Sequence, residues 1–229
     1  MDGAPAKDRK LVIVGDSAFA EVACEYFRRD SRYEVVGFAV EQAYLKRDSL
    51  MGLPVVAFET LRERFPPQDH EVYVAVVYTQ LNRLRTRLAG AAKAMGYRLA
   101  SYVSRHAFVW PNVTIGEHCF IFENNVVQAF ARIGDNVVLW SGNHIGHHST
   151  IGDNVFVSSH VVISGFCEVG ANCFLGVNAA LGNNLTIAKD CWIGPGVVLT
   201  QSTKEGEIHR APESEVAKVA ARRFFRAGD

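Results

Sequence analysis

Residues 127–163 have the sequence VQAFARIGDNVVLWSGNHIGHHSTIGDNVFVSSHVVI, in which every sixth residue is valine, isoleucine or leucine. The same period continues in both directions without one insertion. Its aliphatic positions are Val103, Val109, Ile115, Ile121, Val127, Ile133, Leu139, Ile145, Ile151, Val157, Ile163, Val169, Leu175, Leu181, Ile187, Ile193 and Leu199. A register held over this length indicates a structural repeat.

Two further residue types keep fixed places in the hexad. Glycine directly follows the aliphatic residue at eight positions, and asparagine stands three residues after it at seven. Both types tolerate left-handed backbone conformations, so we expect them to form sharp corners. A short strand and a tight corner in each hexad predict a parallel β-helix with triangular coils of about 18 residues.

The chain before the repeat alternates strand-like and helix-like segments, which predicts a small parallel α/β sheet. Strands are expected at 11–15, 33–40, 53–57 and 71–78, helices near 17–29, 59–65 and 80–95, and a last strand or a bridge into the first coil at 98–103. We therefore expect a flexible tail over 1–10, a Rossmann-like domain over 11–102, the β-helix over 103–200, and a loop with a helix over 201–229 that caps the open end of the prism.

Composition excludes several classes of function. The 24 basic and 24 acidic residues give no net charge, which argues against a nucleic acid as the main partner. The amino terminus lacks the apolar core of a signal peptide, and no apolar run approaches the length of a membrane span. We expect a cytoplasmic protein without membrane insertion. The five cysteines form no close pair, so we expect reduced, packed thiols.

Four of the eight histidines, His144, His147, His148 and His160, lie within 17 residues. Stacking of coils about 18 residues long would place His147 between Ala129 and Gly165, and His148 between Phe130 and Phe166. Small neighbours leave His147 room for a ligand at an outward corner. His148, between two phenylalanines, suits a packed or orienting group.

Three interpretations of this histidine group remain open. The first is a metal site, which would need three converging ligands and for which the sequence shows no matching pattern. The second is that the histidines are polar corner residues without a chemical role, especially His106, His118, His144 and His160. The third is general base catalysis by His147, because imidazole titrates near neutral pH.

The turn from Gly15 to Phe19 lies at the carboxyl end of the first strand and at the start of a helix. Backbone N–H groups at such a turn favour anions. The segment lacks the G-x-G-x-x-G pattern of dinucleotide sites, and a plain strand-to-helix turn capped by Ser17 explains it equally well.

The segment Ile145 to Gly152, together with Gly165 and the segment Asn172 to Gly176, resembles the bacterial nucleotide-sugar acyltransferases of the bacillosamine, sialic-acid and perosamine pathways. The similarity spans nearly the whole chain. It implies a Rossmann-like domain followed by a left-handed β-helix, assembly as a homotrimer, and acetyl transfer from acetyl-CoA, without a metal, to a nucleotide-linked sugar.

The resemblance also implies roles for single residues. His147 corresponds to the catalytic base, with His148 beside it, and Gly165 to a backbone donor at the thioester carbonyl. Val177 and Pro195 correspond to positions that contact the CoA arm. In the amino-terminal domain, Ser17, Ala18, Phe19 and Tyr78 correspond to the nucleotide-sugar site.

Three positions depart from the pattern of these relatives. His148 replaces the acid that commonly follows the catalytic histidine, and a neutral imidazole gives less electrostatic support. Ala39 and Val40 replace an acidic pair after the second strand, with Glu41 nearby, and Tyr78 replaces a glycine. We therefore expect a sugar, nucleotide or acyl group different from those of the best-known members.

These observations favour a CoA-dependent N-acyltransferase acting on the amino group of a nucleotide-linked sugar in surface polysaccharide synthesis. The nearest alternative is sugar O-acetylation. A metal-dependent hydratase of the γ-carbonic-anhydrase kind and a noncatalytic trimer that binds a nucleotide sugar are the other possibilities.

Overall fold

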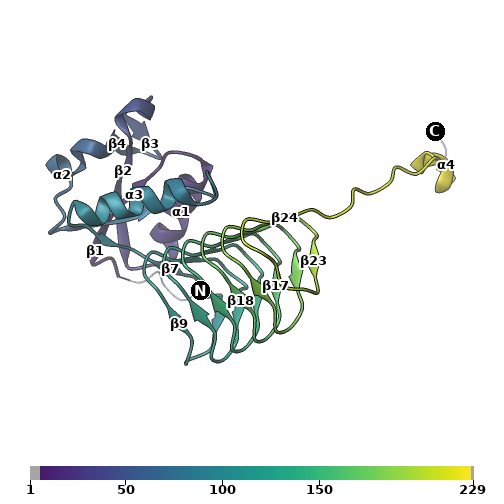
Figure 1. The fold of residues 1–229 in the computed structure, drawn as a ribbon. Coiled ribbons are helices and arrows are strands. Elements are labelled where there is room, and N and C mark those ends of the chain that lie inside the picture. The colour runs from purple at the N-terminus through teal and green to yellow at the C-terminus, as the bar shows by residue number, and fades with distance from the viewer. Residues whose placement is uncertain (1–5, 228–229) are drawn as a thin grey trace.

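The computed structural model describes residues 6–227 and folds them into two packed parts and an extended carboxyl-terminal segment (Figure 1). An α/β domain comes first, and a prism of stacked coils follows it. The tail predicted for residues 1–10 lies partly outside the described residues, and Arg9 and Lys10 belong to the first strand.

The α/β domain contains one six-stranded sheet with the order β3-β4-β2-β1-β5-β6, parallel except for the pair β3 and β4. Its elements are β1 (Arg9–Val14), α1 (Ala18–Asp30), β2 (Tyr33–Val40), η1 (Gln42–Tyr44), β3 (Ser49–Leu50), β4 (Leu53–Ala57), η2 (Phe58–Thr60), α2 (Leu61–Arg64), β5 (His70–Val74), α3 (Arg83–Ala94) and β6 (Arg98–Leu99). Strand β1 is apolar from Leu11 to Val14 because both of its faces are buried.

Strand β5 is shorter than the predicted strand at 71–78. After Val74 the chain leaves the sheet, and three successive residues, Gln80, Leu81 and Asn82, adopt left-handed backbone conformations before α3 begins. This β5–α3 loop, residues 75–82, runs from the carboxyl end of the sheet toward the prism.

The prism is the predicted β-helix, built from three interleaved parallel sheets (Figure 1). Face 1 contains β7 (Tyr102–Val103), β10 (Phe120–Ile121), β13 (Val138–Leu139), β16 (Phe156–Val157), β19 (Phe174–Leu175), β22 (Trp192–Ile193) and β24 (Ile208–His209). Face 2 contains β8 (Phe108–Val109), β11 (Val126–Val127), β14 (His144–Ile145), β17 (Val162–Ile163), β20 (Ala180–Leu181) and β23 (Val198–Leu199). Face 3 contains β9 (Thr114–Ile115), β12 (Arg132–Ile133), β15 (Thr150–Ile151), β18 (Glu168–Val169) and β21 (Thr186–Ile187).

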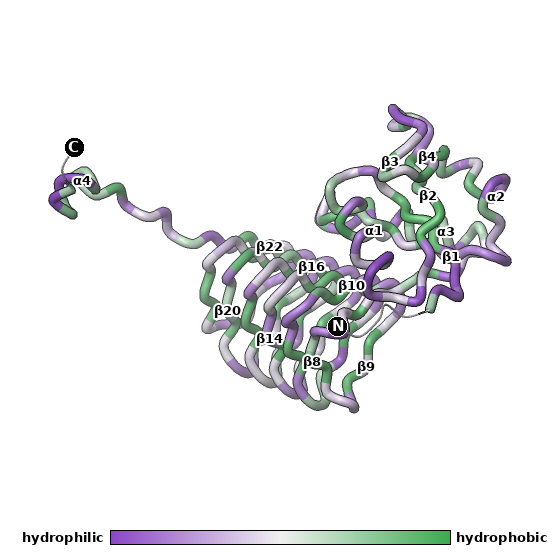
Figure 2. The backbone as a smooth tube through the Cα atoms, turned by 180° about the vertical axis from the view of Figure 1, so that it is seen from behind, coloured by the Kyte–Doolittle hydropathy of each residue, from purple (hydrophilic) through white to green (hydrophobic). Residues whose placement is uncertain are grey.

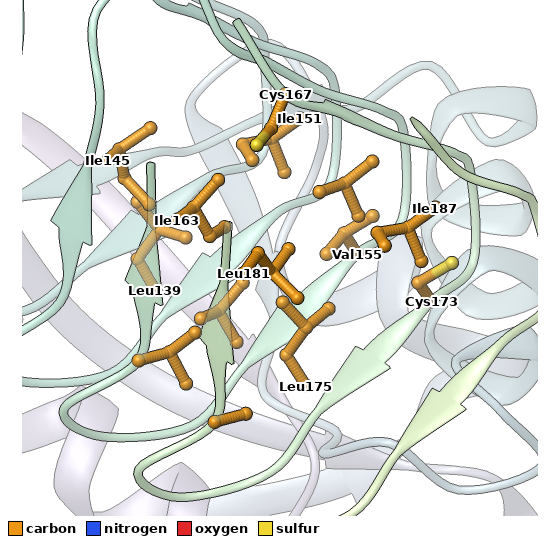
Figure 3. Close-up of a cluster of buried hydrophobic side chains, with 14 of the residues drawn as sticks. Leu139, Ile145, Ile151, Val155, Ile163, Cys167, Cys173, Leu175, Leu181 and Ile187 are labelled. Atoms are coloured by element: carbon orange, nitrogen blue, oxygen red, sulfur yellow. The ribbon is translucent and has the colours of Figure 1, made fainter. Parts of the chain in front are cut away.

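The second residue of nearly every strand in the prism points inward and is buried, which confirms the six-residue register. Figure 3 shows these aliphatic side chains meeting along the axis, with Cys167 and Cys173 among them. All five cysteines, each within the described residues, are free and buried, as expected for packed thiols. The prism therefore owes its stability to the core shared by successive coils.

Three edges join the faces, and each edge carries a column of two-residue corners. Edge A follows face 1 (141–142, 159–160, 177–178, 195–196), edge B follows face 2 (129–130, 147–148, 165–166, 183–184), and edge C follows face 3 (117–118, 135–136, 153–154, 171–172, 189–190). Asparagine at the second corner position has positive φ, as predicted, at every hexad asparagine except Asn112, for example 57° at Asn136 and 63° at Asn154.

The prediction for the hexad glycines was wrong in its reason. None of the eight has a positive φ. At all of them except Gly182 the space for a side chain is missing instead: a Cβ on Gly134 would lie 2.4 Å from Oδ1 of Asp153, and one on Gly170 would lie 2.5 Å from the amide nitrogen of Lys189. These glycines permit the close approach of neighbouring coils.

The two parts share a continuous aromatic core. Face 1 turns its outward residues, including Phe120 and Phe156, toward α1, where Phe19 and Phe27 are buried among them. Phe19, for example, packs against Phe120 with ring centroids 5.8 Å apart. Because so much apolar surface is shared, the α/β domain is held firmly on face 1.

Edge C adds a polar seam between the domains. A ladder of side-chain hydrogen bonds runs Asn136 to Asn154 (2.8 Å), Asn154 to Asn172 (3.1 Å) and Asn172 to Asp190 (3.0 Å). Residues at the start of α3 lie along this ladder and donate hydrogen bonds to it. Arg85, which is fully buried, donates to the side chain and carbonyl of Asn136 and to the carbonyl of Asn154.

The predicted cap over the end of the prism is not found. The segment after β24 runs away from the body, and its helix α4 covers only Ala221–Phe224 of the region 201–229 in which a loop and a capping helix were predicted (Figures 1 and 2). The described residues from Pro212 onward are all exposed, because they contact too little apolar surface to be held against the last coil. Residues 228–229 lie outside the described part.

Candidate functional site

His147 and His148 form the corner of edge B that follows β14. His148 has a φ of 58° and stacks between Phe130 and Phe166, with ring centroids 4.6 and 4.8 Å away, as the coil spacing predicted. His147 is exposed and meets Phe166 edge to face at 5.0 Å. The two imidazoles are joined through their Nδ1 atoms, which lie 3.1 Å apart.

Gly165 lies directly beside the His147 ring in the next coil. A Cβ there would lie 2.9 Å from both Cε1 and Nε2 of His147. Only a glycine at this position therefore allows the imidazole ring to stay where it is. The Gly165 N–H, however, already donates to Oδ1 of Asn183 at 3.0 Å. It could polarise a substrate carbonyl only after the exposed Asn183 side chain turns away.

Val177 and Pro195, predicted to contact the CoA arm, are exposed but lie on edge A. Face 2 separates edge A from edge B, where His147 and Gly165 lie. Within one chain, the structure therefore brings His147, His148 and Gly165 together and leaves Val177 and Pro195 at the opposite margin of the same face.

A cavity of about 290 Å³ opens at the carboxyl ends of β1, β2 and β5. Parallel α/β sheets bind ligands at this edge. Gly15, Asp16 and Ser17 line the cavity from one side, and Glu41 and Tyr44 from the other. Ser17 is the N-cap of α1, but its hydroxyl makes no capping hydrogen bond within the described chain, which leaves it available to a ligand.

Phe19 and Tyr78 take different positions from those the sequence suggested. The Phe19 side chain is buried in the domain junction, where its ring contacts Phe120, so only its backbone N–H can face the turn. Tyr78 packs against Phe174, with ring centroids 4.5 Å apart, and lines a separate cavity of about 460 Å³ beside Trp192. Ala18 is the first residue of α1 and does not line the 290 Å³ cavity.

Sequence reasoning missed the ion pair at the mouth of this cavity. Glu41 follows β2 directly and accepts two hydrogen bonds from Arg87 of α3, at 2.9 and 2.8 Å. The hydrogen bonds from Arg87 hold the pKa of Glu41 below its usual value, so the carboxylate is ionised near neutral pH. Glu41 was noted as the only acid near this point, but nothing local in the sequence connects it to Arg87.

The remaining histidines are dispersed. His118 is buried on edge C, His144 points outward from face 2, and His160 lies on edge A. Within residues 6–227, no three His, Cys, Asp or Glu side chains converge as metal ligands do. In the same residues no helix is long and apolar enough to cross a bilayer.

Comparison with known proteins agrees with the repeat. Residues 130–165 match the model of the bacterial transferase hexapeptide family, which comprises six repeats. No curated protein sequence matches the chain.

Among solved structures, the acetyltransferase domain of PglB from Neisseria gonorrhoeae superposes with a TM-score of 0.77 at 24% identity, over 88% of this chain and 96% of that one. PerB from Caulobacter crescentus, solved with CoA and GDP-perosamine, gives 0.73 at 25% identity, over 90% and 94%. WeeI from Acinetobacter baumannii gives 0.64 at 16% identity, over 83% and 96%.

The chain is thus a hexapeptide-repeat protein with a left-handed parallel β-helix. More particularly, its α/β domain followed by a β-helix is the architecture of these bacterial acetyltransferases, matched along nearly its whole length.

Proposed function

We propose that this protein is an acetyl-CoA-dependent N-acetyltransferase that acts on the amino group of a nucleotide-linked sugar. The observation that carries the proposal is the exposed His147, hydrogen-bonded on one side to His148 and bordered on the other by Gly165, which has no side chain. The similarity to PerB, which was solved with CoA and a nucleotide-linked amino sugar, supports the same chemistry.

The proposed reaction requires His147 to be the donor in the hydrogen bond between the imidazoles. If its Nδ1–H donates to Nδ1 of His148, Nε2 of His147 is unprotonated and can accept a proton. In the reaction, the sugar amine attacks the thioester carbonyl while Nε2 removes a proton from its nitrogen. Collapse of the tetrahedral intermediate breaks the carbon–sulfur bond, and the thiolate takes the proton back from His147.

Charge on the carbonyl oxygen needs a donor in the transition state. The Gly165 N–H is next to the His147 ring, and rotation of Asn183 would release it for this role. A preorganised donor contributes roughly a hundredfold or more to rate. At Gly165 the cost of turning Asn183 away reduces that contribution.

The nucleotide is proposed to occupy the 290 Å³ cavity of the α/β domain. The start of α1 offers backbone N–H groups and the Ser17 hydroxyl to the diphosphate. The ionised Glu41, at the end of β2, is placed to accept hydrogen bonds from ribose hydroxyls.

A homotrimer would complete the site. The outward residues of face 3 are polar, and those of face 1 are covered by the α/β domain except at Ile208 in its last strand. Face 2, in contrast, leaves Phe108, Val162 and Val198 exposed by 53%, 42% and 69%. Such an uncovered apolar face suits subunit association.

In a cyclic trimer each contact joins two different margins of the subunit, so edge A of one copy would lie beside edge B of the next. Val177 and Pro195 would then face the His147 of a neighbour across one groove, in which CoA could lie.

Acetyl-CoA and nucleotide sugars are both cytoplasmic metabolites, so we place the protein in the cytoplasm.

The proposed N-acetyltransferase activity is tested by incubating the protein with acetyl-CoA and nucleotide-linked sugars that differ only in carrying an amine or a hydroxyl. The release of free thiol is followed. Thiol release that requires the amino sugar is expected. Release only with the hydroxyl sugar would indicate O-acetylation, and no release with any sugar would refute transferase activity.

A further inference from the structure

The carboxyl-terminal segment from Val216 to Arg226 has no role in the proposed reaction. It leaves the prism after β24 and extends away from both domains (Figure 1). Its side chains are exposed throughout, including Val216 by 93%, Phe224 by 72% and Phe225 by 76%. The rings of Phe224 and Phe225 contact each other, with centroids 5.1 Å apart. Large apolar side chains that are exposed to solvent in this way indicate a site of interaction with another surface.

The sequence of this segment has a four-residue pattern in three of its four rows, the fourth being Val219 with Arg223. On a helix, residues four apart lie on one face. Val216, Ala220 and Phe224 form one such row, and Ala217, Ala221 and Phe225 form the adjacent row. Lys218, Arg222 and Arg226 form a third row on the opposite side. Continued as a helix in both directions from α4, the segment has an apolar face and a basic face.

The charge of the segment is strongly one-sided. Between Val216 and Arg226 it carries four basic residues, Lys218, Arg222, Arg223 and Arg226, and no acidic one, although the chain as a whole has zero net charge. A short helix with two phenylalanines on one face and cations on the other is the composition of segments that lie in a membrane interface.

We propose that residues 216–226 fold into an amphipathic helix on an anionic lipid surface and tether the protein there. The phenylalanine face would enter the headgroup region while the basic residues meet anionic headgroups. An anionic lipid surface suits this segment, because attraction to such a surface adds with each of its four cations. The four helical residues of α4 supply a first turn from which the helix can extend on binding.

The position of the segment strengthens this inference. It departs from the last coil, so in a trimer of parallel prisms three such segments would leave the same end of the assembly. This step rests on the proposed trimer. Three weak anchors directed at one plane bind far more tightly than one.

The experiment is sedimentation of the full-length protein with vesicles made of equal parts phosphatidylglycerol and phosphatidylcholine, and with vesicles of phosphatidylcholine alone. Two variants test the two faces of the segment. The first combines Phe224→Ser and Phe225→Ser, and the second combines Arg222→Gln, Arg223→Gln and Arg226→Gln. A matched control variant removes the same charge from exposed residues of the α/β domain. It combines Lys46→Gln, Arg62→Gln and Arg64→Gln.

We expect binding to the anionic vesicles that weakens with added salt, little binding to phosphatidylcholine alone, and a loss of about tenfold or more in each segment variant but not in the control. Circular dichroism of the bound protein should show added helix. Absence of binding to anionic vesicles, or an equal loss in the control, would overturn the proposal. Neither outcome bears on thiol release from acetyl-CoA, which is measured without vesicles and should be unchanged in all these variants.

Discussion

The Nδ1 atom of His147 lies 3.1 Å from the Nδ1 atom of His148, and this contact joins the proposed base to a second imidazole. A carboxylate in the place of His148 would stabilise the protonated base by its charge. A neutral imidazole can only orient it, and it does so from a fixed position, because Phe130 and Phe166 hold the His148 ring from both sides.

Replacement of His147 by asparagine should abolish the proposed reaction. The base contributes about 10² to 10⁴ in rate, so kcat for thiol release should fall at least a hundredfold. The exposed position of His147 predicts an unchanged thermal midpoint and unchanged CoA binding, measured by calorimetry. Near-normal turnover in the variant would remove His147 from the mechanism.

His148→Phe separates the orienting hydrogen bond from the packing. Phenylalanine already adopts the same left-handed corner at Phe130 and Phe166, with φ of 65° and 59°, so the stack should survive. We expect kcat to fall about tenfold while KM for acetyl-CoA stays constant. His148→Glu should keep more activity than His148→Phe. If the phenylalanine variant were as active as the parent, the contact between the two histidines would have no catalytic role.

Gly165→Ala tests the space beside the base. The added Cβ would lie 2.9 Å from two atoms of the His147 ring and displace it, so activity should fall about tenfold or more with the fold intact. Gly182→Ala is the matched control, because its Cβ would meet nothing nearer than 3.4 Å. Equal activities of the two variants would contradict the arrangement.

His118 should make stability depend on pH. Its Nε2 accepts the Val74 N–H at 2.8 Å, and its Nδ1–H donates to Oδ1 of Asn136 at 2.7 Å. Burial lowers the pKa of His118 to about 3 from the usual 6.5. The unfolded chain therefore binds a proton more readily, and stability present above pH 6.5 is lost as the pH falls toward 3.

The loss attributable to His118 is on the order of 5 kcal/mol across that window. Urea unfolding followed through it should show a steeper fall for the parent than for His118→Gln, whose amide can replace both hydrogen bonds without titrating. Parallel curves for the two proteins would show that His118 does not control this pH dependence.

Arg85 is expected to hold the two domains together. Burial lowers the pKa of its guanidinium to about 10, which still leaves it charged at neutral pH, and its partners are carbonyl and amide oxygens of both domains. Arg85→Met should cost about 3 kcal/mol, because several buried carbonyls lose their donor. Arg87→Met, which removes only the exposed pair with Glu41, should cost about 0.5 kcal/mol in the same urea titration. Similar losses in both would refute a special role for Arg85.

The β-helix could be predicted because its period is local, and stacking by one coil then placed His147 beside Gly165 and His148 between two phenylalanines. The domain junction was also open to prediction. The outward residues of face 1, among them Tyr102, Phe120 and Phe156, recur with the period of one coil and are apolar, which indicates a covered face.

Other features depend on contacts that no local pattern contains. The pairing of Glu41 with Arg87 joins a strand end to a helix that begins 42 residues later. The helix expected in the carboxyl-terminal segment forms only over Ala221–Phe224, because the apolar residues there have no surface in this structure to pack against.

The seam between α3 and edge C limits how such a protein can change its length. Each coil is a module, and a whole coil can be duplicated or lost without shifting any inward side chain. Asn136, Asn154, Asn172 and Asp190 are nevertheless matched one by one to the start of α3, through Arg85, Asn82 and Arg83. Modules can therefore be gained beyond Asp190, whereas a gain or loss within the seam would break the match, and growth of the molecule is confined to the end from which the carboxyl-terminal segment departs.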